Sequence, residues 1–223
     1  MDLVSQNLLM TSGGKKDPVY LDDVFSTYLY KGTGSAVTVN NGIDLAGKGG
    51  MTWIKSRTSP QYHSLIDTVR GPTKAVFSNH AMGEDTGTNG YMTSFNNNGF
   101  TTGNYGNTSQ SNQDFTSWSF RKQKGFFDVV TWTGNGSTRT IAHNLGSVPG
   151  CIMVKNTSSS IDWTVWHRGA AQANATNTLT LNSSGAAATN NTYFDNGSTP
   201  PTKDNFTVHT SNRVNANGET YVA

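Results

Sequence analysis

The sequence has little charge, few apolar residues and few of the residues that catalysis requires. Only 13% of its 223 residues are charged, where an ordinary globular chain has roughly a quarter, and 34% are hydrophobic. No apolar run approaches the ~20 residues of a transmembrane helix. Asn, Ser, Thr and Gly make up 45% of the chain and are poor residues for a helix interior. Coiled coils, helical bundles and membrane-spanning proteins are therefore excluded, and we expect an all-β fold.

Cysteine occurs once, as Cys151, so the chain forms no internal disulfide. The apolar residues that follow Cys151 predict a small buried thiol. The net charge of +2 arises from 16 basic and 14 acidic residues that form no blocks. Nucleic-acid binding requires a basic face, so no nucleic acid is expected as a partner. The first residues lack the pattern of a secretory signal, which predicts assembly in a cytoplasm.

Catalytic patterns are also scarce. Glutamate occurs only as Glu84 and Glu219, and no pair of carboxylates has the strand spacing of a sandwich glycosidase. No Gly-x-Ser-x-Gly turn is present, and the five histidines share no metal-ligand spacing. We therefore expect neither an enzyme nor a metal or cofactor.

The sequence contains an internal repeat of about 100 residues. The segment 30–35 matches 132–137, and 50–55 matches 150–155. Further matches join 99–101 to 205–207 and 114–117 to 220–223. One module therefore occurs twice.

Within each copy, short segments with period-2 alternation are separated by Asn-Gly turns about every ten residues. Strands are expected in the first copy at 37–39, 51–54, 64–67, 75–77 and 115–118. This rhythm is typical of antiparallel sandwiches of the jelly-roll or lectin-like kind. We predict two tandem β-sandwich modules after a short N-terminal arm.

The predicted organisation is an arm over residues 1–20, a first module over 21–124 and a second over 125–223. Polar and Gly-rich residues make the arm a flexible segment that could dock on a partner surface. The apolar residues expected to make this contact are Val4, Leu8, Leu9 and Met10. The second copy stops three residues before the equivalent of Phe120, so we expect its last strand to be truncated in a longer natural protein.

Two polar and aromatic clusters are candidates for ligand binding. They occupy matching places in the two copies: His63, Asp67 and Arg70 in the first, and Trp163, His167 and Arg168 in the second. Stacking by an aromatic ring and hydrogen bonds from Arg and Asp are the usual means of holding a sugar. The alternative is structural, namely a polar pair at a sandwich edge together with core aromatics.

Several segments resemble tandem modules in tail proteins of bacteriophages, marine phages in particular. They are 23–30, 67–71, 127–136 and 143–150. The modules of that family are similar to concanavalin-type lectin sandwiches, and the family has no established catalytic residues to carry over. The resemblance covers about residues 20–223 and implies a virion component of the tail or its fibres.

The function predicted is that of a structural virion protein, a tail fibre or tail-associated appendage that docks through its arm and contributes to host attachment. The partners expected are other tail proteins, further copies of the chain, with a trimer assigned by analogy to fibres, and host surface glycans. The alternatives are a capsid decoration or tail-tube protein, or a carbohydrate-binding adhesin without a scaffold role.

Overall fold

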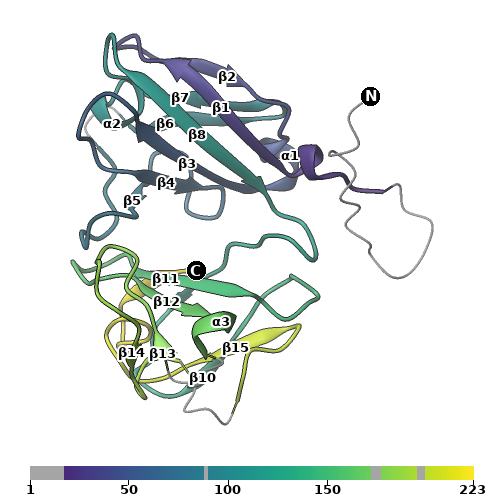
Figure 1. Cartoon of the computed structure of the whole chain (residues 1–223), viewed down its shortest axis with the longest axis vertical. Coiled ribbons are helices and arrows are strands. Elements are labelled where there is room, and N and C mark those ends of the chain that lie inside the picture. Colours follow the sequence, from purple (N-terminus) through teal and green to yellow (C-terminus); the bar gives the residue numbers. More distant parts are fainter. Residues whose placement is uncertain (1–17, 88–89, 172–176, 195–198) are drawn as a thin grey trace. The chain divides into compact units, whose positions relative to one another are not determined.

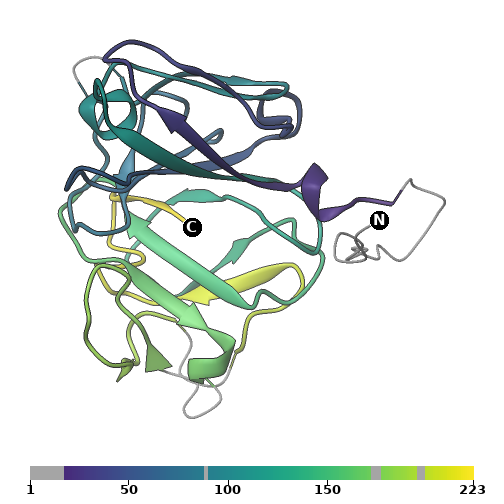
Figure 2. The ribbon, with the colours of Figure 1, turned by 45° about the horizontal axis from the view of Figure 1, so that its top comes forward.

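The computed structural model describes residues 18–87, 90–171, 177–194 and 199–223. This part of the chain is all-β, as predicted, and its helix is confined to one 3-10 turn and three four-residue turns. Figures 1 and 2 show the chain as strands joined by loops. None of the described helices is long and apolar enough to span a bilayer. The expected docking residues Val4, Leu8, Leu9 and Met10 lie outside the described residues.

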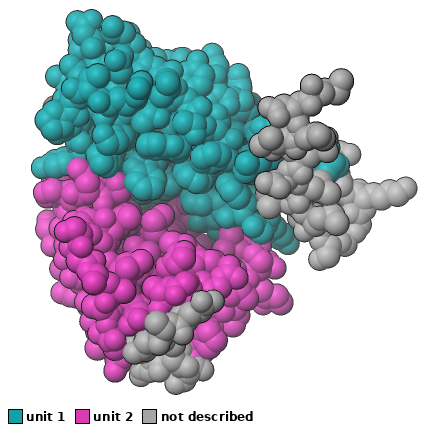
Figure 3. Space-filling model, in the orientation of Figure 1, with its two compact units in different colours: residues 1–75, 86–128 teal, residues 76–85, 129–223 magenta. Residues whose placement is uncertain are grey.

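The chain divides into two compact units, shown in different colours in Figure 3. The first contains the residues up to 75 together with 86–128, and the second contains 76–85 and 129–223. In order, the elements of the first unit are η1 (Leu21–Asp23), β1 (Phe25–Lys31), β2 (Thr38–Asn40), α1 (Leu45–Lys48), β3 (Gly50–Ser56), β4 (Ser64–Asp67), β6 (Met92–Asn96), β7 (Gly99–Thr102), α2 (Gly106–Ser109) and β8 (Asp114–Arg121).

The second unit has a similar succession of short strands. Its elements are β5 (Val76–Phe77), β9 (Thr131–Thr133), β10 (Arg139–Ala142), β11 (Cys151–Asn156), β12 (Thr164–His167), α3 (Arg168–Ala171), β13 (Asn177–Thr178), β14 (Ala188–Thr189), β15 (Asn205–Val208) and β16 (Thr220–Val222).

Four neighbouring strands have the same order in the larger sheets of the two units. In the first unit the neighbours are β1, β8, β3 and β4, and in the second they are β9, β16, β11 and β12, all antiparallel. The smaller sheets also correspond, because β2 pairs with β7 and β10 pairs with β15. The sequence repeat therefore has a counterpart in the strand pairing.

Aromatic contacts connect the larger sheet of each unit to the smaller one. Tyr30 of β1 meets Phe100 of β7 edge-on, with ring centroids 6.4 Å apart. At the equivalent place Trp132 of β9 meets Phe206 of β15 edge-on at 5.9 Å. Each unit is therefore of the β-sandwich type, with a core between its two sheets.

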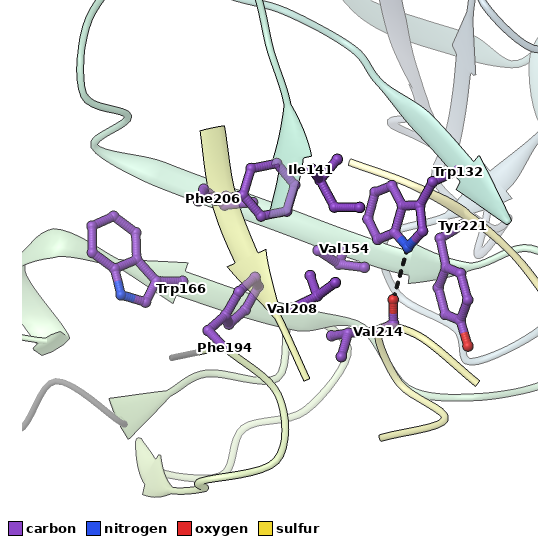
Figure 4. Close-up of a cluster of buried hydrophobic side chains, with 10 residues drawn as sticks. Trp132, Ile141, Val154, Trp166, Phe194, Phe206, Val208, Val214 and Tyr221 are labelled. Carbon is purple, nitrogen blue, oxygen red and sulfur yellow. Dashed lines mark hydrogen bonds between the residues drawn. The ribbon is translucent and has the colours of Figure 1, made fainter. Parts of the chain in front are cut away.

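The core of the second unit is a cluster of ten buried side chains (Figure 4): Trp132, Ile141, Ile152, Val154, Trp166, Phe194, Phe206, Val208, Val214 and Tyr221. The indole Nε1 of Trp132 donates to the carbonyl oxygen of Val214 at 3.0 Å, so its polar atom is satisfied inside the core. Burial of each Val, Ile or Phe side chain of this cluster contributes about 1.5–3 kcal/mol to the stability of the fold.

Both sandwiches require glycine at the loop that follows the first strand of the larger sheet. A Cβ atom at Gly32 would lie 2.2 Å from the carbonyl oxygen of Gln110, and one at Gly134 would lie 2.0 Å from that of Ala216. Such distances are far below contact distance, so a side chain would push the two loops apart. The matching of these loops explains why Gly-x-Gly recurs in the sequence 102 residues later.

The segment 76–85 belongs to the second unit, although its sequence lies in the first repeat. The indole Nε1 of Trp163 donates to the carbonyl oxygen of Phe77 at 2.7 Å. Near the other end of the segment, the amide of Glu84 donates to the carbonyl oxygen of Thr157 at 2.8 Å. The repeat alone predicts a boundary between residues 124 and 125. The compact units divide between residues 128 and 129, and the segment 76–85 also belongs to the second unit.

Cys151 is exposed, and its predicted burial is wrong. Ile152 and Val154 face the core of the second unit, and alternation along β11 turns Cys151 to the opposite face. The apolar neighbours that suggested burial are thus the residues that exclude Cys151 from the core.

Candidate functional site

The two predicted clusters lie in different units and are described separately. In the first unit, Asp67 and Arg70 form a buried ion pair, with Nε of Arg70 2.5 Å from Oδ2 of Asp67. The other carboxylate oxygen accepts from the amides of Val69 and Arg70, at 3.0 and 2.9 Å. The guanidinium also donates to the carbonyl oxygen of Leu65. These contacts hold the turn that ends β4. The pair therefore has the structural role that was the alternative to ligand binding.

His63 precedes β4 and is half-buried. Burial lowers the pKa of its imidazole, and the positive charge of Lys55 lowers it further. The ring therefore holds its proton less strongly than a free histidine, so His63 is a neutral hydrogen-bonding group near pH 7.

In the second unit, Trp163 is a core residue rather than an exposed platform. Its side chain is 3% exposed, and its indole nitrogen is bonded to Phe77. Its backbone amide donates to Oδ1 of Asn182 at 3.0 Å. A ring in this position anchors the segment 76–85 and offers no face for stacking on a sugar.

His167 and Arg168 remain exposed at the corner where β12 ends and α3 begins. Nδ1 of His167 accepts from the amide of Gly169 at 3.1 Å, so the neutral ring carries its proton on Nε2. The amide of Arg168 donates to the carbonyl oxygen of Gly150 at 2.9 Å, which fixes the start of the helical turn. One imidazole and one guanidinium are thus presented side by side in sequence on a fixed backbone.

Cys151 lies directly opposite His167 in the β11–β12 pair. Partial burial raises the pKa of the Cys151 thiol. A nucleophilic cysteine requires the opposite shift, because the thiolate is the reactive form. This pair therefore lacks the electrostatics of an activated nucleophile.

A buried polar network that no sequence motif indicates surrounds Lys155. This lysine has no exposed side-chain surface, and its Nζ donates to the carbonyl oxygens of Asn156 and Ser159, at 2.6 and 3.4 Å. Burial lowers the pKa of Lys155 to about 8, although the carboxylates of Asp162 and Glu219 oppose that shift. The ammonium thus closes the loop that follows β11.

Glu219 and Asn156 complete this network from the other side of the loop. The Glu219 carboxylate accepts from the Ser159 hydroxyl at 2.8 Å and from the Asn156 amide nitrogen. The hydrogen bond from Ser159 is the main reason why the pKa of Glu219 is lowered. Oδ1 of Asn156 accepts from the amides of Ser158 and Ser159, both at 3.0 Å.

We call this arrangement, in which a lysine ammonium bonds to backbone carbonyl oxygens of the loop that follows its strand, the loop clamp. The first unit has a simpler form of it. Nζ of Lys55 donates to the carbonyl oxygen of Ser56 at 2.9 Å, and Oγ of Ser56 accepts from the amide of Ser59 at 3.1 Å. The signal that could have revealed it is the match of Lys55 to Lys155 in the repeat. Because the clamp recurs in both units, its chemistry is structural.

Residues 21–223 match the family described as a domain of unknown function, DUF7483. The chain belongs to this family. The matched range takes in residues of both units. No curated protein and no solved structure matches the chain.

Proposed function

We propose that the chain is a structural protein of a bacteriophage virion, a tail fibre or tail-associated appendage that contributes to host attachment. The observation that carries the proposal is the duplication of one sandwich with the same strand order, aromatic contacts and loop clamp. Rigid sheets that hold polar loops are a common way to present a recognition surface. The likeness of several segments to phage tail proteins supplies the setting, a particle assembled in bacterial cytoplasm.

In this proposal the arm docks on other tail proteins through Val4, Leu8, Leu9 and Met10. Deletion of residues 1–17 should give particles that lack the protein, while the purified variant keeps the circular dichroism of the full chain. Particles that retain the shortened protein would contradict the docking role.

Carbohydrate binding is the second candidate function, and the exposure of His167 and Arg168 at one corner favours it. A glycan array probed with the full chain tests it. We expect the double variant His167→Ala/Arg168→Ala to lose the bound glycans, and the matched control Lys203→Ala/Asp204→Ala, at an exposed ion pair elsewhere in the second unit, to keep them. If no glycan binds, carbohydrate binding is contradicted and only the scaffold role remains. If the first variant binds glycans as the unchanged chain does, the binding site does not include His167 and Arg168.

A further inference from the structure

Strand β1 forms an edge of the larger sheet in the first unit. Among the described residues its ladder partner is β8, paired over all seven residues from Phe25 to Lys31. The equivalent edge strand of the second unit, β9, has only three residues. This edge strand is therefore longer in the first unit than in the second.

The backbone register shows which groups of β1 point outward. The amide of Gly32 donates to Gln113, and the carbonyl oxygen of Val24 accepts from Arg121, both at 2.8 Å. Because bonding alternates along an antiparallel pair, the even-numbered residues of β1 bond to β8. The N–H and C=O groups of Phe25, Thr27, Leu29 and Lys31 consequently face away from the sheet.

This edge carries few of the features that usually prevent strand addition. Natural edge strands are shortened, bulged or guarded by proline and charge. β1 is continuous and contains no proline, and its one charged residue, Lys31, stands at its end. Leu29, next to the central residue of the strand, is 58% exposed.

We propose that β1 pairs antiparallel with β1 of a second copy of this chain, with Thr27 opposite the partner's Thr27. In this register the outward-facing residues Phe25, Thr27 and Leu29 each meet an outward-facing residue of the partner. Phe25 then lies opposite the partner's Leu29. Lys31, at the end of the strand, comes near the partner's Asp23, an exposed residue of the 3-10 turn η1 that precedes β1. A cross-strand pair of apolar residues stabilises a sheet, and the opposite charges of Lys31 and Asp23 attract each other at its ends.

Charge complementarity selects this register from its neighbours. If the pairing is shifted by one residue, so that Thr27 lies opposite the partner's Tyr28, the outward backbone groups of one strand meet groups of the other that are already bonded to β8. A register centred on Tyr28 keeps the hydrogen bonds but places Phe25 opposite the partner's Lys31 and leaves Asp23 without a cation. The Thr27 register is two-fold symmetric, so the contact closes as a dimer and does not continue into a fibre.

The inference stands independently of the virion proposal, and charge exchange tests it on the full chain. Light scattering after gel filtration should show a dimer that forms as protein concentration rises. Lys31→Glu alone places two acidic residues together, and Asp23→Lys alone places two basic residues together, so each variant should be monomeric. An equimolar mixture of the two variants should recover the dimer, because each of its two charge pairs then joins an acidic residue to a basic one.

Removal of one outward amide gives a second test. Thr27→Pro deletes a donor that makes no bond to β8, so the sandwich should fold and the dimer should be lost. Thr131→Pro is the matched control on β9, where Val130 exchanges both backbone bonds with Ala223 and Thr131 points outward; it should leave the dimer intact. A wild-type chain that is monomeric at every concentration, a trimer, or a dimer that survives both Lys31→Glu and Thr27→Pro would overturn the proposal.

Discussion

Trp132 stacks on Tyr221 with ring centroids 5.4 Å apart and ring planes inclined by 14°. The equivalent residues of the first unit, Tyr30 and Phe115, stack at 5.3 Å and 13°. In each unit the two rings stand directly opposite each other on neighbouring strands. These are the strands that come first and last in the sequence of the larger sheet, β1 and β8 in the first unit and β9 and β16 in the second. The same contact therefore joins the two ends of each repeat.

Trp132→Ala should destabilise the second unit strongly. The variant loses the stack and leaves the Val214 carbonyl oxygen without its indole donor. Large aromatic-to-alanine changes in a core cost about 3–5 kcal/mol. Urea unfolding should show this loss, and the control Tyr30→Phe, which removes only the hydroxyl bond to Thr108, should cost about 1 kcal/mol. Equal losses for the two variants would contradict the importance of the stack.

Gly134→Ala should destabilise the fold by more than about 1 kcal/mol, since the new methyl group overlaps the carbonyl oxygen of Ala216. Gly185→Ala is the control, because its nearest neighbour, Oγ of Ser183, lies at an ordinary 3.4 Å. Thermal unfolding of the two variants provides the comparison. A neutral Gly134→Ala would mean that the loops are not held together as described.

Asp67→Asn should cost about 3–5 kcal/mol, because it leaves the buried guanidinium of Arg70 without its counter-charge. Asp204→Asn is the matched control. Its ion pair with Lys203 is more than 60% exposed on both sides, where such pairs contribute little. Denaturant titration should therefore separate the variants clearly, and similar midpoints would argue against a structural ion pair at Asp67.

Stability should rise with pH from about pH 8 because of Lys155. Its pKa is lowered to about 8 in the folded chain, below the ordinary value near 10.5, so the unfolded chain binds more protons between these values. The Cys151 thiol acts in the opposite direction above about pH 9, which makes pH 8–9 the informative window. Lys155→Met should abolish the rise in urea-unfolding free energy, and an unchanged slope would contradict the burial of the ammonium.

Much of the fold could be predicted from the repeat and the alternation. The expected strands at 51–54, 64–67 and 115–118 are confirmed as parts of β3, β4 and β8. The match of 99–101 to 205–207 places Phe100 and Phe206 at equivalent contacts. These features follow from local periodicity, which a single sequence carries.

Long-range choices were beyond the same signals. No local pattern assigns the segment 76–85 to the second unit, because its bonds to Trp163 and Thr157 join residues 86 and 73 positions apart in the sequence. Apolar neighbours misled the interpretation of Cys151, since alternation matters more than composition on a half-buried strand. The Lys155 network was missed because a lysine on a strand is normally exposed.

Of the candidate site, the sequence could indicate residue types but not their surroundings. Trp163 and the Asp67–Arg70 pair have internal partners, which only the fold reveals. His167 and Arg168 keep the exposure that a ligand would need.

The most direct test of the proposed function is to locate the chain on purified particles of a phage that encodes it, by electron microscopy with antibodies raised against the two sandwiches. We expect label on the tail or its fibres, at the few copies per particle of an appendage. Label over the capsid or along the tail tube at high copy number, or particles without the chain, would contradict it.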